Sequence, residues 1–211
     1  MNNGASTAGA TGAKAQNASW PDGYGRQVFD SVDSTLSEAA RQASELTGST
    51  WILAQEQTAA RGRRGRSWAT PRGNFAATLM MRRSESPSTA ALRSFVASLA
   101  LRRAFVATTR DEGAFTLKWP NDVLLNGGKV AGILLESIGD FLAIGIGVNL
   151  AHAPGADQVE AGALRPVSVV AETGKVVPPE VFLDALAAEY AQLETQFQTY
   201  GFSPIRTAWL S

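Results

Sequence analysis

The sequence of 211 residues contains no cysteine and a single histidine, His152. The absence of cysteine excludes disulfides, thiolate metal ligands and a thiol nucleophile. One histidine is too few for a metal site built from several imidazoles. A Ser-His-Asp triad is also disfavoured, because His152 lies beside Pro154 and Gly155 in a stretch rich in turn-forming residues.

An excess of charge and long apolar runs are absent as well. Nineteen basic residues balance nineteen acidic ones, which argues against a surface covered in nucleic-acid-binding charge. No run approaches the roughly 20 consecutive apolar residues that span a bilayer, and the N-terminus lacks the layout of a secretory signal. We therefore expect a cytoplasmic protein whose length suits one sizeable domain.

Apolar periodicity predicts one domain over residues 20–211, preceded by a disordered tail at 1–19 that is rich in small and polar residues. Strands are predicted at 28–32, 51–55, 74–81, 115–118, 123–125, 129–136 and 141–150. Helices are predicted at 36–46, 88–108, 167–172, 178–200 and from 205 onwards. The hairpin signal Asn126-Gly127-Gly128 indicates an antiparallel meander. The predicted fold class is α/β of the α+β type, with a mixed, largely antiparallel sheet flanked by helices.

A loop at residues 59–68, here called the arginine loop, packs four arginines and two glycines into positions 61–66. Each guanidinium offers a fork of donors that matches carboxylate or phosphate oxygens, and glycine allows backbone to approach a ligand closely. Two interpretations stand: a solvated basic surface loop, or a loop that closes over an anionic small molecule. The loop joins two predicted strands, and ligand sites are commonly built on loops of this kind.

The residues Asp33, Ser34 and Thr35 precede a predicted helix. Ser34 or Thr35 is suited to cap that helix, and Glu38 completes a capping-box pattern from Thr35. Hydroxyls and free amides at a helix start also suit a polar ligand. The two interpretations are compatible.

In the last predicted strand, Gly145 and Gly147 alternate with large apolar residues, which leaves one face of the strand bare. Paired strand glycines often mark close approach of a ligand or of another backbone. The alternative is tight packing of a helix on the sheet. Neither this strand nor the arginine loop satisfies G-x-G-x-x-G, so the sequence does not support a Rossmann nucleotide site.

The residues that carry chemistry supply hydroxyls, amides and cations but no obvious general base. They are Ser34, Thr35, Gln57, Arg61, Arg63, Arg66, Lys118, Asn121 and Lys129. This mixture suits a reaction that brings anions together, such as nucleotide or phosphoryl transfer, in which positioning and electrostatic stabilisation do most of the catalysis.

Five motifs in order make the chain, from about residue 28 onwards, resemble the catalytic domain of bacterial biotin–protein ligases. They are Asp-Ser-Thr at 33–35, the arginine loop with Trp68, Lys-Trp-Pro-Asn-Asp at 118–122, Gly-Lys-Val-Ala-Gly-Ile-Leu at 128–134 and Gly-Ile-Gly-Val-Asn-Leu at 145–150. The resemblance implies a domain similar to that of class II aminoacyl-tRNA synthetases.

The resemblance also implies a two-step reaction. The carboxylate of biotin attacks the α-phosphate of ATP, with Mg²⁺ assisting, to give biotinyl-5′-AMP and pyrophosphate. A lysine of a biotin carboxyl carrier protein, a subunit of acetyl-CoA carboxylase, then takes the biotin and releases AMP. The expected protein is a monomer or weak homodimer that binds neither nucleic acid nor membrane.

Carried over by position, the resemblance assigns three sets of residues. Catalysis is assigned to Lys129, Arg63 and Lys118. Biotin binding is assigned to Ser34, Thr35, Gln57, Arg61, Gly62, Arg63, Lys129, Gly132 and Leu134. Binding of ATP or the adenylate is assigned to Arg66, Trp68, Lys118, Asn121 and Asn149, and Asn121 is also the candidate contact to Mg²⁺.

The chain departs from the family pattern in three places. Ala60 replaces a common glycine and would cost about 1 kcal/mol if that position needs a positive φ. Leu36 replaces a common asparagine, which removes one polar contact. The chain also stops at Ser211 without the small β-rich C-terminal domain that family members usually carry.

Two alternatives to biotin ligation stand beside it. A lipoate or octanoate ligase or transferase is expected to share the fold, although the arginine loop favours biotin. A nucleic-acid-binding module that uses the arginine loop is the second, and it predicts affinity that falls steeply with salt.

Overall fold

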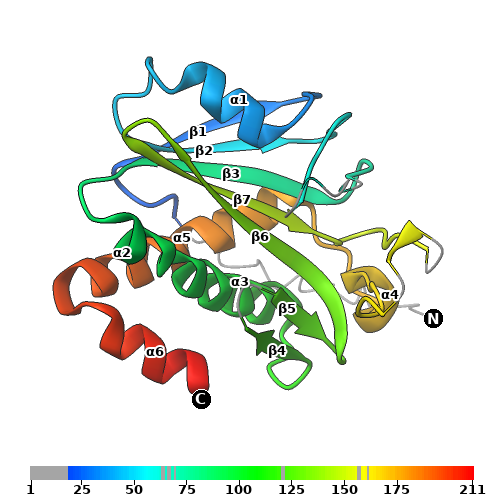
Figure 1. Ribbon diagram of the computed structural model, residues 1–211. Helices are drawn as coiled ribbons and strands as arrows, with labels where there is room; N and C mark the ends of the chain where they lie inside the picture. Colours follow the sequence, from blue (N-terminus) through cyan, green and yellow to red (C-terminus); the bar gives the residue numbers. More distant parts are fainter. Residues whose placement is uncertain are drawn as a thin grey trace, which may run out of the picture.

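The computed structural model describes residues 19–62, 65, 68, 70–119, 122–155, 158–160 and 162–211. Residues 1–18 of the predicted tail lie outside them. The described part of the chain forms one seven-stranded sheet in the order β1-β2-β3-β7-β6-β5-β4, with helices on both faces (Figure 1). No helix within these residues is long and apolar enough to cross a membrane.

The strands confirm the largely antiparallel sheet. They are β1 Tyr24–Phe29, β2 Ser49–Ala54, β3 Phe75–Arg82, β4 Phe115–Lys118, β5 Asp122–Leu125, β6 Gly128–Ile138 and β7 Phe141–Val148. Among the paired strands of the described residues, β1–β2 is the one parallel pair, and β4 to β7 form the predicted meander. The strand predicted at 28–32 is wrong in its position, because pairing in register with β2 runs from Tyr24 to Phe29 and ends there.

The helices are α1 Thr35–Gln42, α2 Pro87–Ala91, α3 Arg93–Thr109, α4 Val169–Thr173, α5 Pro179–Tyr200 and α6 Phe202–Leu210. The first is shorter than predicted, and the predicted helix at 88–108 is two helices. It divides at Leu92, whose N–H donates to the carbonyl of Thr89, three residues back, in a tighter turn than the α-helix. The last helix begins at Phe202 rather than at 205.

The helices divide the core into two parts. On one face α3 and α5 cover the sheet with large buried side chains such as Phe105, Phe182 and Tyr190. On the other face the short helix α1 packs over Ile52 and Met80. Because α1 covers only part of its face, the neighbouring surface of β6 and β7 is left for a binding site.

A buried ion pair joins α3 to α5. Arg93 and Glu194 are 4% and 3% exposed, and Arg93 Nη2 lies 2.7 Å from Glu194 Oε1. Arg93 also pairs with Glu85 at the start of α2. Burial, reinforced by the Glu194 carboxylate, raises the pKa of the adjacent Tyr190 well above its ordinary value. The cluster is therefore a structural anchor on the face away from the candidate site.

Candidate active site

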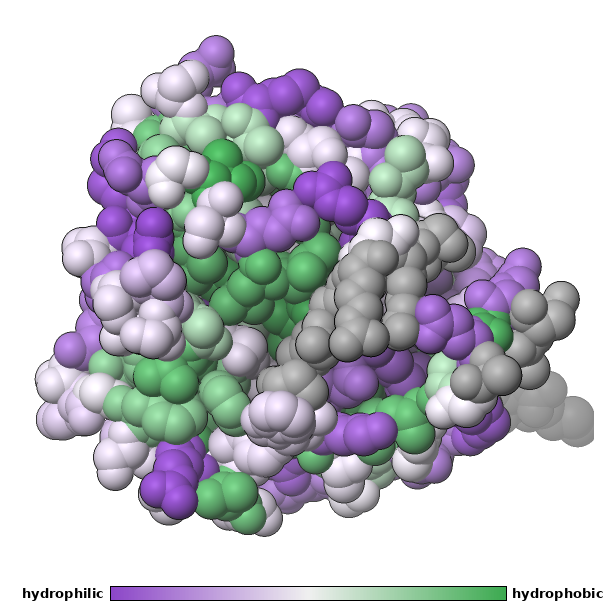
Figure 2. Space-filling view, in the orientation of Figure 1, coloured by the Kyte–Doolittle hydropathy of each residue, from purple (hydrophilic) through white to green (hydrophobic). Residues whose placement is uncertain are grey.

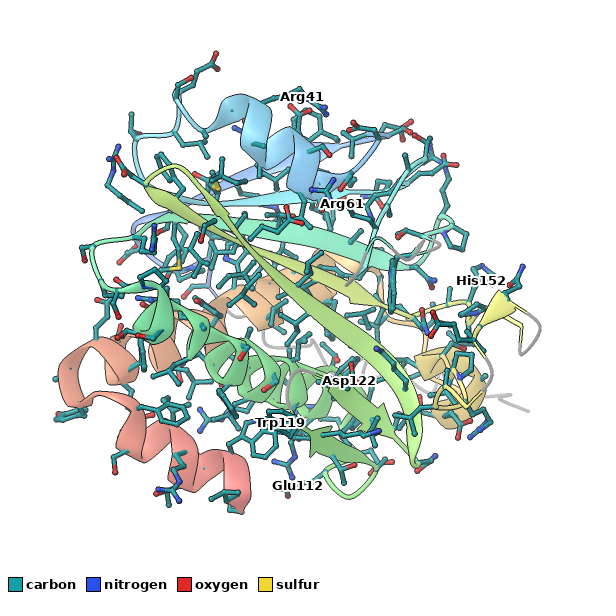
Figure 3. The ribbon with its side chains drawn as sticks, viewed as in Figure 1. Arg41, Arg61, Glu112, Trp119, Asp122 and His152 are labelled. Carbon is teal, nitrogen blue, oxygen red and sulfur yellow. The ribbon has the colours of Figure 1, made fainter. Side chains whose placement is uncertain are left out.

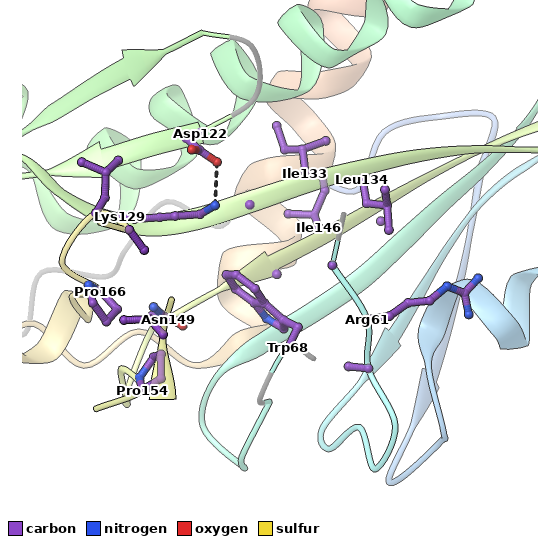
Figure 4. A pocket seen from close by; sticks show the side chains of 18 of the residues that line it. Arg61, Trp68, Asp122, Lys129, Ile133, Leu134, Ile146, Asn149, Pro154 and Pro166 are labelled. Atoms are coloured by element: carbon purple, nitrogen blue, oxygen red, sulfur yellow. Dashed lines mark ion pairs between the residues drawn. The ribbon is translucent and has the colours of Figure 1, made fainter. Parts of the chain in front are cut away.

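A cavity of about 880 Å³ opens on the face of the sheet that carries α1. Its floor is β6 and β7. Its walls are the start of α1, the arginine loop and the segment at 154–166, here called the outer wall. Figure 2 shows a hydrophobic area over β6 on this face, bordered by hydrophilic residues. Figure 4 shows the cavity extending from Arg61 and Leu134 at one end to Lys129, Asp122 and Pro166 at the other.

All predicted site residues that the structure describes line this one cavity. They are Ser34, Thr35, Gln57, Arg61, Gly62, Trp68, Lys118, Lys129, Gly132, Leu134 and Asn149. Arg63, Arg66 and Asn121 lie outside the described residues, so their assignments stay predictions. His152 is exposed and lies away from the cavity (Figure 3).

Glycines on the floor let two large side chains approach the sheet. A Cβ at Gly145 would lie 2.8 Å from Leu36 Cδ1, and one at Gly147 would lie 2.4 Å from Trp68 Nε1. The indole also lies over Gly132, the cross-strand partner of Gly147. Gly145 therefore serves packing of helix on sheet, while Gly147 admits a cavity-lining indole. Leu36 is 4% exposed and fills the place where a polar contact was expected.

The capping box predicted at α1 is wrong. The N-cap is Ser34, whose side chain makes no capping bond, and Thr35 is already helical. Glu38 pairs with Arg41 instead. Arg41 also hydrogen-bonds Asp33, which lowers the pKa of that carboxyl to about 2 and, with the bond from Ser34 N–H to Asp33 Oδ1, fixes the turn. The Ser34 hydroxyl, 2% exposed and lining the cavity, is thus left for a ligand.

A chain of polar groups continues from Thr35 at this end of the cavity. The Thr35 N–H donates to Gln57 Oε1 at 2.8 Å, and the Thr35 hydroxyl lies 3.2 Å from the same oxygen. Thr78 Oγ1 donates to Thr35 Oγ1, and Gln57 Nε2 donates to Thr70 Oγ1. The network holds hydroxyl and amide groups in fixed orientations, which suits recognition of a polar, uncharged ligand group.

The opposite end of the cavity is built around Lys129. Its Nζ lies 2.8 Å from Asp122 Oδ1 and 6.0 Å from the centroid of the Trp68 ring. Lys118 lines the same end. The sequence assigned no role to Asp122, although it closes the Lys-Trp-Pro-Asn-Asp motif. This end offers cations and one carboxylate to a ligand of opposite or mixed charge.

Asn149 adds a carboxamide beside Lys129. Its backbone N–H donates to the carbonyl of Val130, and the residue is 3% exposed. Its side chain lines the cavity, so its carboxamide is a second polar group available to a ligand.

The guanidinium of Arg61 is bound to the protein itself. It contacts Glu136 on β6 at 2.8 and 3.4 Å and the Ser37 hydroxyl on α1 at 3.3 Å. Figure 3 shows Arg61 beside α1, on the other side of β6 from Asp122. Arg61 therefore ties the arginine loop across the end of the cavity. No motif or periodic pattern in the sequence pointed to Glu136.

The expected strain at Ala60 does not arise. Arg110 and Asn126 are the non-glycine residues with positive φ in the described part of the chain. The Ala60 carbonyl accepts a bond from Trp68 N–H at 3.0 Å, which closes the base of the arginine loop. Alanine is compatible with this arrangement.

Sequence reasoning missed the outer wall altogether. Pro154, Val159, Leu164 and Pro166 line the cavity, yet the sequence predicted only an irregular segment there. The segment has neither the period of a helix nor that of a strand, so no local pattern marked it.

Comparison with known proteins settles the family. The sequence profile of the biotin/lipoate A/B protein ligase family matches residues 28–150. This chain belongs to that family. The family predicted from the motifs is therefore confirmed.

Relatives within this family are similar over most of the chain. A biotin--[acetyl-CoA-carboxylase] ligase of Paracoccus denitrificans is 56% identical over 185 residues, 85% of this chain and 77% of that protein. A namesake in Mycobacterium tuberculosis is 36% identical over 67% of this chain and 54% of its own length. The chain thus spans about half to three quarters of the length of these relatives.

Solved structures share the fold of this family member. Biotin protein ligase from Aquifex aeolicus in complex with biotin and ATP has a TM-score of 0.78 at 25% identity, covering 88% of this chain and 76% of that one. The Leishmania major enzyme in complex with biotinyl-5-AMP has a TM-score of 0.71 at 27% identity, covering 87% and 81%. The predicted synthetase-like architecture is confirmed.

Proposed function

We propose that this family member is an ATP-dependent biotin–protein ligase. The observation that carries the proposal is one cavity with a neutral hydrogen-bonding end at Ser34 and Gln57 and a cationic end at Lys129. The ureido ring of biotin suits the first end and a nucleotide phosphate the second. Relatives named as biotin ligases, and similar structures that hold biotin with ATP or biotinyl-5-AMP, support the same assignment.

The first chemical step is activation of biotin. A biotin carboxylate oxygen attacks the α-phosphorus of ATP, the bond to the β-phosphate oxygen breaks, and pyrophosphate leaves. Lys129 stabilises the negative charge that builds up around the α-phosphate. Asn149 and Trp68 hold the adenylate, and the arginine loop keeps water from the anhydride.

The second step is transfer to a protein. The neutral ε-amine of a carrier lysine attacks the carbonyl carbon of the adenylate, and the bond to the AMP oxygen breaks. The nitrogen gives up one proton to solvent, so an amide and AMP are the products. The carrier is a biotin carboxyl carrier protein of acetyl-CoA carboxylase, as the name of the Paracoccus relative suggests.

The residues present fit a magnesium ion that arrives with ATP. Mg²⁺ commonly binds through one or two carboxylates plus substrate phosphates, and Asp122 supplies one carboxylate at the cationic end. The described residues contain no cluster of three or more potential ligands that would hold a metal by themselves. When bound, Mg²⁺ neutralises phosphate charge, and Asp122 together with Asn121 would hold it.

Biotin-dependent release of pyrophosphate from ATP tests the proposal. We expect release with biotin and none with buffer alone. Competition calorimetry between biotin and lipoate tests the alternative that the protein is a lipoate ligase or transferase. Tight binding of lipoate without binding of biotin would favour that alternative.

The Gly147→Ala variant should weaken nucleotide use. Its Cβ would meet Trp68 Nε1 at 2.4 Å, so the indole must move off the floor. We expect KM for ATP to rise about tenfold, because displacing one well-packed contact costs of the order of 1.4 kcal/mol. Steady-state pyrophosphate release measures this.

The Gly113→Ala variant is the matched control, because a Cβ there meets nothing within 4 Å. It should leave KM for ATP unchanged. Equal effects of the two variants would show that Trp68 does not contribute to nucleotide binding.

A further inference from the structure

Asn74 lies where the chain that follows the arginine loop enters the sheet, near the point where the chain leaves the sheet toward the outer wall. It directly precedes β3, and β3 pairs with β7 so that Phe75 lies opposite Val148. The arginine loop therefore enters the sheet beside the point where the chain leaves β7 toward the outer wall. Asn74 itself does not line the cavity.

Asn74 is 2% exposed, and both the oxygen and the nitrogen of its carboxamide are hydrogen-bonded. Oδ1 accepts bonds from the N–H groups of Ala151 at 3.0 Å and His152 at 2.9 Å, and Nδ2 donates to the His152 carbonyl at 2.9 Å. One buried side chain thus fixes the backbone at residues 151–152, directly before the outer wall.

A close backbone approach at the same place supports this contact. Gly73 has φ +91, and a Cβ there would lie 3.0 Å from Ala151 Cβ. The two segments therefore touch directly before Asn74. A shift of the chain at residues 73–74 would therefore also move the chain at residues 151–152.

The far end of the outer wall is fixed by backbone bonds to β6. Lys129 N–H donates to the Arg165 carbonyl at 2.8 Å, and Val167 N–H donates to the Lys129 carbonyl at 3.0 Å. The outer wall is thus held between β6 and Asn74. Of these two anchors, Asn74 is the one that depends on a side chain.

We propose that Asn74 is a positioning residue that sets the outer wall against the Lys129 end of the cavity and thereby determines affinity for the nucleotide. The inference rests on the proposed function, in which biotin takes the Ser34 end and ATP the Lys129 end. Asn74 acts through the backbone at 151–152 and touches neither substrate.

The Asn74→Ala variant tests the inference by its effect on two KM values. KM for ATP should rise about tenfold, the equivalent of one lost buried hydrogen bond, while KM for biotin stays within about twofold. The matched control is Ser98→Ala, which removes a buried hydroxyl that accepts from Trp209 Nε1 at 2.9 Å on the opposite face of the sheet. It should lower stability and leave both KM values unchanged.

Two further measurements keep the test decisive. Hydrogen exchange should speed up at residues 151–160 of Asn74→Ala and not along β6, a result that does not depend on catalysis. If Asn74→Ala fails to fold, Asn74→Asp keeps the acceptor, loses the donor, and should show the same selectivity in KM to a smaller degree. Unchanged exchange, or equal changes in both KM values, would overturn the role of Asn74. If exchange speeds up in Asn74→Ala as expected but the wild-type protein releases no pyrophosphate in response to biotin, the role of Asn74 stands and the proposed function is contradicted.

Discussion

Replacing Lys129 with alanine should slow formation of the adenylate by about 10²- to 10³-fold. Lys129 Nζ lies at the cationic end of the cavity, 2.8 Å from Asp122 Oδ1, and the variant leaves that carboxylate facing the incoming phosphates. Loss of one preorganised group that stabilises transition-state charge costs about 10²- to 10³-fold in kcat. Single-turnover formation of biotinyl-5′-AMP measures the effect.

Two variants distinguish the loss of adenylate formation in Lys129→Ala from a nonspecific effect of removing a lysine. Lys175→Ala removes an exposed lysine that does not line the cavity and should leave the rate unchanged. Lys129→Arg keeps the charge but changes its geometry, and should retain part of the activity. A normal adenylate yield in Lys129→Ala would remove Lys129 from the mechanism.

The Arg93→Ala variant should lose a large part of the protein's stability while the cavity stays intact. It leaves Glu194, 3% exposed, without its partner beside Tyr190. Breaking a buried ion pair from one side costs about 3–5 kcal/mol, because the remaining charge is left desolvated. Urea unfolding followed by circular dichroism measures the free energy of unfolding.

The molecule supplies a matched control on the same two helices. Arg103 and Glu189 also join α3 to α5, but they are 39% and 27% exposed and 3.5 Å apart. Arg103→Ala should cost less than about 1 kcal/mol. The double variant Arg93→Met, Glu194→Leu should regain much of the lost stability, because it leaves no charge of the pair buried. Similar losses from Arg93→Ala and Arg103→Ala would contradict the importance of burial.

The elements that local patterns determine could be predicted from the sequence. Asn126 and Gly127 have φ of 50 and 77, as a tight hairpin turn requires, and the predicted meander follows from them. Val96, Leu99 and Phe105 lie at helical spacing within the predicted helix at 88–108, and all three are buried in the core. The predicted site residues that the structure describes line one cavity, and motifs rather than apolar periodicity identified them.

Contacts between distant segments could not be predicted in this way. The Asp122–Lys129 pair depends on the register of β5 and β6, which shifts between Val123 and Leu124. Arg93 and Glu194 are 101 positions apart, and no local pattern links them. The capping role of Thr35 at α1 was also wrongly predicted. Its hydroxyl bonds to Gln57 and Thr78, which lie on other segments of the chain, and does not cap the helix.

The most direct test of the account is the intact mass of a purified apo carrier domain after incubation with this protein, biotin and ATP. We expect the carrier to gain one biotinyl group, with no gain when ATP is omitted and a gain slowed by about 10²- to 10³-fold when Lys129→Ala replaces the wild-type protein. An unchanged carrier mass, together with no biotinyl-5′-AMP in the mixture, would contradict the proposal that this cavity activates biotin.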